Sequence, residues 1–389
     1  MAALSTPVHA PPCLHIAMST SRPLHNFSAG PGALPDCVVA ETREAIAAVP
    51  GVGLSILGIS HRSAWFRQVV EEAEEHFRVL LGLSADYHVL FLQGGSTLQF
   101  SQIAMTLLRG QTQPADYLDT GYWSGKSIPE AEREGPVRVA WSGRAEGYRR
   151  LPTDEELTLS AAAPYLHYIS NETVEGLQFH RTLGHDGVLR ICDMSSDFLS
   201  RPMDATKFGL IYAHAQKNLG PSGVTVVVIR DDLVQRTPDG LPSMLDYRCH
   251  AKAHSIYNTP PVFAIYVTML IARWVRHTIG GVQAMDVINR AKAGRLYAAI
   301  DRSGGFYRGA AAREDRSLMN VSFNLPTPAL DAAFAAEAEA AGLHGLAGHR
   351  SRGGVRASIY NAVTLEAVAA LTEFMEEFRV RHGGAASAA

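Results

Sequence analysis

The sequence predicts an α/β protein whose larger part holds a mostly parallel sheet and whose smaller part is an α+β domain. Two observations support this. Short apolar runs rich in β-branched residues recur between residues 88 and 229, and helical segments separate most of them, as in parallel α/β sheets. From residue 285 onward the chain shifts to helices rich in Ala, Arg and Glu, with short strands at 318–325 and 354–359, which indicates the second domain.

The composition excludes several classes of protein. The 389 residues are 47% hydrophobic and 19% charged, which is typical of a globular protein with a large core. The net charge of −3 gives no basic footprint for nucleic acid. The apolar run at 262–272 is too short to cross a bilayer and ends at Arg273, so we expect no membrane partner.

The cysteines are scattered and form no C-x-x-C pair (Cys13, Cys37, Cys192, Cys249). This spacing argues against a zinc site and against a disulfide framework, and we predict no metal. It fits a reducing compartment, and we expect a cytoplasmic protein.

The start of the chain has the composition of a disordered extension. It lacks an early cationic region and is broken by Pro7, Pro11 and Pro12, which argues against a signal peptide, and the natural start is either Met1 or Met18. We predict this division of the chain: a disordered extension at 1–22, a large domain at 36–284, a small domain built from 23–35 and 285–382, and a disordered tail at 383–389.

Two helices are predicted before the first strand, each after a glycine-rich loop. The loop at 25–35 precedes a helix at 38–48. The loop at 51–62 ends in two potential cations, His61 and Arg62, and precedes a helix at 65–81 that Gly82 closes.

A candidate phosphate site follows the strand at 88–93. Two glycines lead into a helix that runs to residue 108, and Ser96 and Gln99 have the spacing of a capping box. Unpaired N–H groups and the positive end of the helix dipole would point at one spot. An ordinary capped helix explains the same residues.

The segment from Gly121 to Ser127 is close to a nucleotide-binding Walker A loop. One spacer residue is missing, and Tyr122 and Trp123 place bulk where the backbone should wrap phosphates. We therefore reject a P-loop ATPase. Trp123 remains a candidate for stacking on a bound ring, with core packing as the alternative.

Two further strands end in polar residues. The strand at 165–170 leads into Asn171-Glu-Thr173, and the strand at 188–193 ends in Asp193. A carboxylate at a buried strand end costs free energy unless it is paired. The partner of Asp193 is either a protonated ring nitrogen or the amides of Ser195 and Ser196.

Lys217 lies in turn residues between two buried strands, at 210–213 and 224–229. Burial there would lower the pKa of its amine and make the amine a usable nucleophile. A solvated loop lysine is the alternative. The ligand crevice of such a sheet lies at the carboxyl ends of its strands.

The chain continues with a rigid segment at 257–261, a long apolar helix at 262–277, and the small domain, whose loops carry His349, Arg350 and Arg356.

A loop lysine, a strand-end aspartate and a phosphate cradle are together what pyridoxal 5′-phosphate (PLP) needs. The amine holds its aldehyde, the carboxylate keeps its pyridine nitrogen protonated, and amides bind its phosphate.

These motifs resemble those of the phosphoserine aminotransferases, a family of the class V, fold-type I, PLP-dependent aminotransferases. The resemblance runs from about Asn26 to about His382. It rests on Asn26-Phe-Ser-x-Gly-Pro31, Ser60-His-Arg62, Gly94-Gly95 with Gln99-Phe100, Gly121-Tyr-Trp123, Asn171-Glu-Thr173, Asp193-x-Ser-Ser196, Leu199-Ser-Arg-Pro202, Ala215-Gln-Lys-Asn218, Asn258-Thr-Pro-Pro261, Gly348-His-Arg350 and Arg356-Ala-Ser-Ile-Tyr-Asn361. The resemblance implies a large domain with a mostly parallel, seven-stranded-type sheet and a smaller α+β C-terminal domain.

The resemblance also implies roles for individual residues. Lys217 would form a Schiff base with PLP, and Asp193 would pair with the pyridinium. Further implied cofactor contacts are Ser96 and Thr97 in the phosphate cradle, Gln216 on the phosphate, Trp123 on the ring, Thr173 on the ring hydroxyl oxygen, and Asn258 and Thr259 on the phosphate in the neighbouring subunit. The implied substrate contacts are Arg356 on the α-carboxylate, and His61, Arg62, His349 and Arg350 around the distal phosphate or carboxylate.

The implied reaction is transamination between L-glutamate and 3-phosphohydroxypyruvate, which gives O-phospho-L-serine and 2-oxoglutarate in a homodimer. In some bacteria the family also serves PLP synthesis through 4-phosphohydroxy-L-threonine. One departure is Thr97, where some members carry Arg within a Gly-Arg-Gly run, so one cation near the substrate phosphate is expected to be absent.

A class V lyase, such as a cysteine desulfurase, is the rival class. It would need a cysteine nucleophile on a mobile loop. Cys249 is the candidate between Lys217 and the small domain, and it has no obvious activating surroundings.

Overall fold

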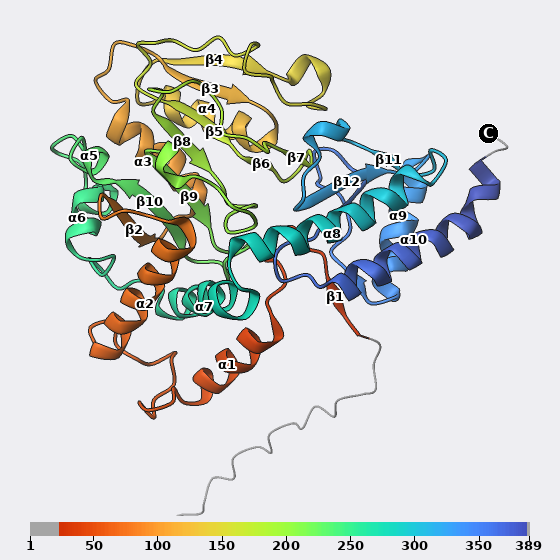
Figure 1. Cartoon of the computed structure of the whole chain (residues 1–389), viewed down its shortest axis with the longest axis horizontal. Helices are drawn as coiled ribbons and strands as arrows, with labels where there is room; N and C mark the ends of the chain where they lie inside the picture. The colour runs from red at the N-terminus through yellow and green to blue at the C-terminus, as the bar shows by residue number, and fades with distance from the viewer. Residues whose placement is uncertain (1–22, 387–389) are drawn as a thin grey trace, which may run out of the picture.

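The computed structural model describes residues 23–386 and confirms an α/β architecture in two parts (Figure 1). The predicted extension at 1–22 lies outside the described residues. At the other end, α10 (Leu365–Ala386) continues through residues 383–386. The predicted tail therefore starts too early, because these residues extend the last helix, and 387–389 lie outside the described residues.

A seven-stranded sheet forms the large part. Its strands lie in the order β2 (Tyr87–Leu92), β10 (Thr225–Arg230), β9 (Leu210–His214), β8 (Arg190–Asp193), β5 (Leu166–Ile169), β3 (Ala115–Asp119) and β4 (Val137–Ser142). Neighbours are parallel except at β10, which is antiparallel to β9 and β2. The mostly parallel sheet is confirmed. The exception arises because the short loop that carries Lys217 reverses the chain between β9 and β10.

Both faces of this sheet are covered, which explains why its strands read as continuous apolar runs. Successive side chains of a strand point to opposite faces. Val226 and Val228 of β10 join a core with α2 (Ala64–Leu81) and α7 (Val262–Arg273), whereas Val227 and Ile229 join a core with α3 (Gly95–Leu107) and α4 (Tyr122–Glu132). The smaller helices of this part are α1 (Asp36–Ala47), α5 (Asp231–Val234) and α6 (Tyr247–Lys252).

The predicted apolar helix is α7, which continues as a π-helical segment from Trp274 to Ile279. The stretch Val262–Ile279 has the length and composition to cross a membrane, but 56% of it is buried inside the protein. It packs against α2 and supplies Ile265, Met269 and Leu270 to the core. We interpret it as a core helix of the large part.

The small part has a core of its own. Its three-stranded antiparallel sheet is β11 (Arg308–Gly309), β12 (Asn320–Asn324) and β14 (Val355–Ser358), with helices α8 (Val282–Asp301), α9 (Pro328–Ala340) and α10. Near the start of the chain, β1 (His25–Asn26) pairs with β13 (Leu343–His344), and Phe27 enters this core. Figure 1 shows the red β1 beside the blue C-terminal elements. On this basis we propose that residues 23–35 belong to the small domain.

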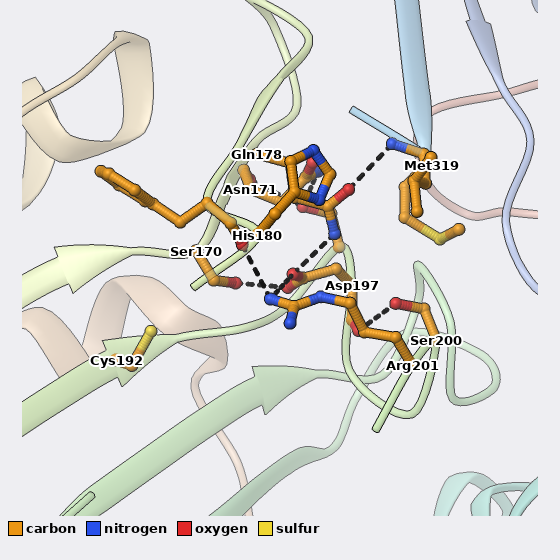
Figure 2. A network of polar contacts seen from close by, with 12 residues as sticks. Ser170, Asn171, Gln178, His180, Cys192, Asp197, Ser200, Arg201 and Met319 are labelled. Atoms are coloured by element: carbon orange, nitrogen blue, oxygen red, sulfur yellow. Dashed lines mark hydrogen bonds and ion pairs between the residues drawn. The ribbon is translucent and has the colours of Figure 1, made fainter. Parts of the chain in front are cut away.

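A buried polar network joins the two parts (Figure 2). It includes the short hairpin β6 (Asn171–Glu172) and β7 (Leu177–Gln178). The Asn171 side chain donates to Ser196 Oγ (2.7 Å) and to Asn320 Oδ1 (2.7 Å), and the Gln178 side chain donates to Asp197 (3.0 Å) and accepts from the amide of Leu318 (2.8 Å). The network therefore fastens the loop after β8, which follows Asp193, to the small part.

Candidate active site

A cavity of about 350 Å³ lies at the carboxyl ends of the central strands. Six of the residues predicted to bind a cofactor line it together: Ser96, Thr97, Trp123, Asp193, Gln216 and Lys217. The other lining residues are Gly94, Gly95, Ile169, Asn171, Ser195, His214 and Gly223. The sheet thus places its polar strand ends where parallel α/β folds bind ligands.

The helix α3 begins earlier than the capping box predicts. Its N-cap is Gly94, in a left-handed conformation (φ 94°), and no side chain caps the helix. A Cβ at Gly94 would meet the Leu98 side chain at 2.4 Å, so this start requires glycine.

The predicted capping box at Ser96 and Gln99 is therefore wrong. The Ser96 hydroxyl is hydrogen-bonded to Ser195 Oγ (2.7 Å), and the Gln99 side chain accepts from Tyr247 (2.6 Å) and donates to Gln102 (2.9 Å). The start of α3 nevertheless lines the cavity, so a phosphate site there remains our proposal.

Lys217 is held in the loop between β9 and β10. Its Nζ donates to Thr173 Oγ1 (2.7 Å) and lies 5.5 Å from the centroid of the Trp123 ring. Burial lowers the pKa of Lys217, although the carboxylates of Asp193 and Glu172 counteract this. A lowered pKa increases the neutral fraction of the amine, which is the form that attacks a carbonyl carbon.

Asp193 is the buried last residue of β8. Its Oδ1 accepts a hydrogen bond from the Ser195 amide (2.8 Å), so one of the two alternative partners is present. Burial raises the pKa of Asp193, and the charge of Lys217 partly offsets this. A second cation in the cavity, such as a protonated ring nitrogen, would further stabilise its ionised form.

The residues of this cavity fit PLP. Lys217 offers an amine, Asp193 a carboxylate, Trp123 an aromatic ring, and the start of α3 its N–H groups. Gln216 has a buried Oε1 with no hydrogen-bond partner among the described residues. The same side-chain amide has two N–H donors, which are the groups that could bind a phosphate oxygen.

Two of the predicted substrate residues come from the small part, and neither is a lining residue of the cavity. Arg356 is close enough to Lys217 for its charge to lower the pKa of that amine. Arg356 of β14 is half-buried, and its Nε has no hydrogen-bond partner among the described residues. The ring of His349 packs on that of Tyr122, with 4.7 Å between centroids. Burial and the charge of Arg356 lower the pKa of His349, so the imidazole tends to be neutral. Arg350, next along the chain, is exposed.

Four predicted site residues are not among those that line the cavity of their own protomer. His61 and Arg62 line a separate groove of about 760 Å³, together with residues of α2. The Gln93 side chain donates to Asn258 Oδ1 (3.4 Å) and to the Thr259 carbonyl (3.2 Å). His61 and Arg62 therefore lie in a different groove, whereas Asn258 and Thr259 contact Gln93, the residue before Gly94, without lining the cavity.

Sequence reasoning missed several residues of the site. His214 ends β9 just before Gln216 and Lys217, and this position at a strand end was a signal that it lines the same crevice. Glu172 accepts from the amides of Trp123 (3.2 Å) and Ser124 (3.0 Å) and so fixes the start of α4. No local pattern reveals that contact, because the partners are far apart in the sequence.

Apart from Trp123, the residues that supported other functions lie outside the cavity lining. Cys249 is in α6, and the Walker-like segment forms the start of α4, where Ser127 Oγ donates to the Ser124 carbonyl (2.8 Å). Residues 23–386 contain no group of three His, Cys, Asp or Glu side chains that could hold a metal ion.

Known proteins are similar to this chain over most of its length. The family model for class V aminotransferases matches residues 24–371. A curated phosphoserine aminotransferase from Herpetosiphon aurantiacus is 48% identical over 360 residues, which are 92% of this chain and 99% of that protein.

Solved structures give the same result. Phosphoserine aminotransferase from Bacillus circulans subsp. alkalophilus superposes with a TM-score of 0.90 at 46% identity and covers 93% of this chain and 100% of its own. PLP-bound phosphoserine aminotransferase from Trichomonas vaginalis superposes with a TM-score of 0.85 at 36% identity, covering 91% of this chain and 100% of its own. The chain belongs to the class V aminotransferase family and, within it, to the phosphoserine aminotransferases.

Proposed function

We propose that this enzyme transfers an amino group from L-glutamate to 3-phosphohydroxypyruvate, giving O-phospho-L-serine and 2-oxoglutarate, with PLP held covalently by Lys217. The observation that carries the proposal is one cavity shared by Lys217, Asp193, Trp123 and the start of α3. The PLP-bound relative from Trichomonas vaginalis supports the choice of cofactor. We place the reaction in cytoplasmic serine synthesis, and we propose 4-phosphohydroxy-L-threonine, for pyridoxine synthesis, as a second product.

Bound PLP would supply an aldehyde carbon and a conjugated ring that stabilises negative charge on the substrate Cα. Lys217 would hold that carbon, and its amine, once free, would move a proton from the substrate Cα to the cofactor carbon. Asp193 keeps the ring nitrogen protonated, and Trp123 restrains the ring. The start of α3 and the Gln216 amide bind the phosphate.

The substrate has an anionic group at each end, and the arginines around the cavity suit it. Arg356 binds the α-carboxylate, because its planar guanidinium can form two parallel hydrogen bonds to a carboxylate. His349 and Arg350 contribute to binding the distal phosphate or carboxylate.

An assay of purified protein with matched acceptors tests this proposal. With L-glutamate as donor, 3-phosphohydroxypyruvate should be aminated far more efficiently than glyoxylate or pyruvate, which lack a distal anion. A preference for glyoxylate or pyruvate would contradict the proposed substrate.

We further propose a homodimer in which each cavity is completed by residues from the second protomer. His61, Arg62, Asn258 and Thr259 do not line the cavity of their own protomer. Several apolar side chains of α1 and the loop that follows it are also exposed, which is expected of a surface covered by another subunit (Val39, Ile46, Val52, Leu54, Leu57).

Mixed dimers are expected to show whether Arg62 acts across the interface. Lys217→Ala and Arg62→Ala proteins should each have little activity. After unfolding and refolding together they should recover activity at about a quarter of all sites, because half the dimers are mixed and each mixed dimer has one intact site. Wild-type protein refolded in the same way is the control. No recovery, or an active monomer, would show that Arg62 does not act in the second subunit's site.

A further inference from the structure

We infer that His214 is an additional cofactor-binding residue, which donates a ring N–H to the phosphate group of PLP. Three titratable residues line the cavity among the described residues: Asp193, Lys217 and His214. The proposed reaction uses the first two and leaves the third without a role. The inference rests on the proposed function and adds a residue to its phosphate site.

The backbone of His214 is tied to the start of α3. Its amide donates to Ser195 Oγ (3.1 Å), and that hydroxyl is hydrogen-bonded to Ser96 Oγ (2.7 Å). These two hydrogen bonds connect the last residue of β9 with the first turn of α3. The Cα atom of His214 is therefore held close to the proposed phosphate cradle.

The imidazole lies directly against the second glycine of this cradle. A Cβ built on Gly95 would be 3.3 Å from Cε1 and 3.4 Å from Nδ1 of His214. Because residue 95 has no side chain, the ring can approach the N-terminus of α3, where the N–H groups would bind phosphate oxygens.

The ring is free to bind a ligand. Neither ring nitrogen of His214 has a hydrogen-bond partner within residues 23–386. Both nitrogens remain accessible, because neither is among the fully buried atoms that lack a partner. Burial and the charge of Lys217 lower the pKa of His214 to about 4, so near neutral pH the imidazole is uncharged. A neutral imidazole has one N–H donor, which suits a phosphate oxygen, and a bound dianion would raise the pKa of the ring again.

The composition of the cavity wall explains why this donor matters. Residue 97 is threonine, so the start of α3 brings no cationic side chain to the cavity. Lys217 is needed at the aldehyde carbon. Within one protomer, the phosphate would then be bound by helix N–H groups, hydroxyls, the Gln216 amide and His214.

Binding of PLP and of pyridoxal, which lacks the phosphate, to the apoprotein separates a phosphate contact from general packing. Quenching of tryptophan fluorescence gives both dissociation constants. The variant H214A should bind PLP on the order of 10–100-fold more weakly, the loss expected for a hydrogen bond to a charged group, with pyridoxal binding unchanged. The variant H214N keeps a neutral N–H donor and should recover much of the PLP affinity.

The control is H88A, which removes a half-buried histidine of β2 that pairs with Asp231 (2.8 Å). It should leave both dissociation constants unchanged. An equal loss of PLP and pyridoxal affinity in H214A, or no loss at all, would overturn the inference. If H214A does not fold, H214N against H214L gives the same comparison. Wild-type protein that binds PLP no better than pyridoxal would instead overturn the proposed function.

Discussion

Replacing Asp193 with asparagine is expected to slow transamination by on the order of 10²–10³-fold while leaving the protein folded. Asparagine has almost the same shape and keeps the oxygen that accepts from the Ser195 amide. It lacks the negative charge that would keep a bound ring nitrogen protonated. The substitution therefore removes an interaction that strengthens as charge develops in the reaction.

Single-turnover rates with L-glutamate, measured by the absorbance of the coenzyme, test this expectation, together with PLP binding and the melting temperature. Asp197→Asn is the matched control. Asp197 is a second buried carboxylate, but it accepts from Ser170 and Gln178 in the network behind the site (Figure 2). Loss of the Asp197 charge should lower the melting temperature and have little effect on the single-turnover rate. Unchanged turnover in Asp193→Asn would mean that this carboxylate only accepts from the Ser195 amide.

Phosphoserine is expected to exceed serine as amino donor by on the order of 10⁴ in kcat/KM, because serine would leave the cations of the distal site unpaired. We expect the ratio of the two kcat/KM values to be somewhat below this figure, because Thr97 supplies no positive charge for the phosphate. Similar efficiencies for the two donors would contradict the phosphoserine assignment without affecting membership of the aminotransferase family.

Two arginine variants divide this specificity between the ends of the substrate. Arg356→Ala should weaken all amino donors together, because every amino acid has an α-carboxylate. Arg62→Ala should harm phosphoserine and glutamate and spare alanine, which has no distal anion. Arg290→Ala is the control, since Arg290 pairs with Asp286 on α8 (2.8 Å). A uniform loss with Arg62→Ala would contradict its distal role.

The parts of the fold that depend on local pattern could be predicted from the sequence. β9, β10 and the loop that holds Lys217 follow from two apolar runs separated by turn residues. The start of α3 could not be predicted, because a serine with the spacing of a capping box competes with Gly94, and only the packing of Leu98 decides between them. The extent of α10 was also underestimated, since its glycines and alanines read as a tail.

The parts of the site that depend on distant contacts needed the structure. The pairing of β1 with β13 and the hydrogen bonds of Glu172 to the start of α4 connect segments far apart in the chain. Motifs identified Lys217, Asp193 and Trp123 as site residues. They did not indicate that His61 and Arg62 lie away from the cavity of their own protomer. Motifs identify residue types that suit a chemistry, whereas their meeting in space is set by tertiary and subunit packing.

The proposed function depends most on Lys217 as the residue that holds PLP. Borohydride reduction of the PLP-loaded enzyme, followed by peptide mapping, identifies the lysine that carries the pyridoxyl group. We expect the label on the peptide that contains Lys217, whose Nζ lies between Thr173 and the Trp123 ring in the cavity. A label on Lys126, which lies 5.7 Å from the centroid of the Tyr122 ring, or on Lys207, which pairs with Asp186, would contradict the account.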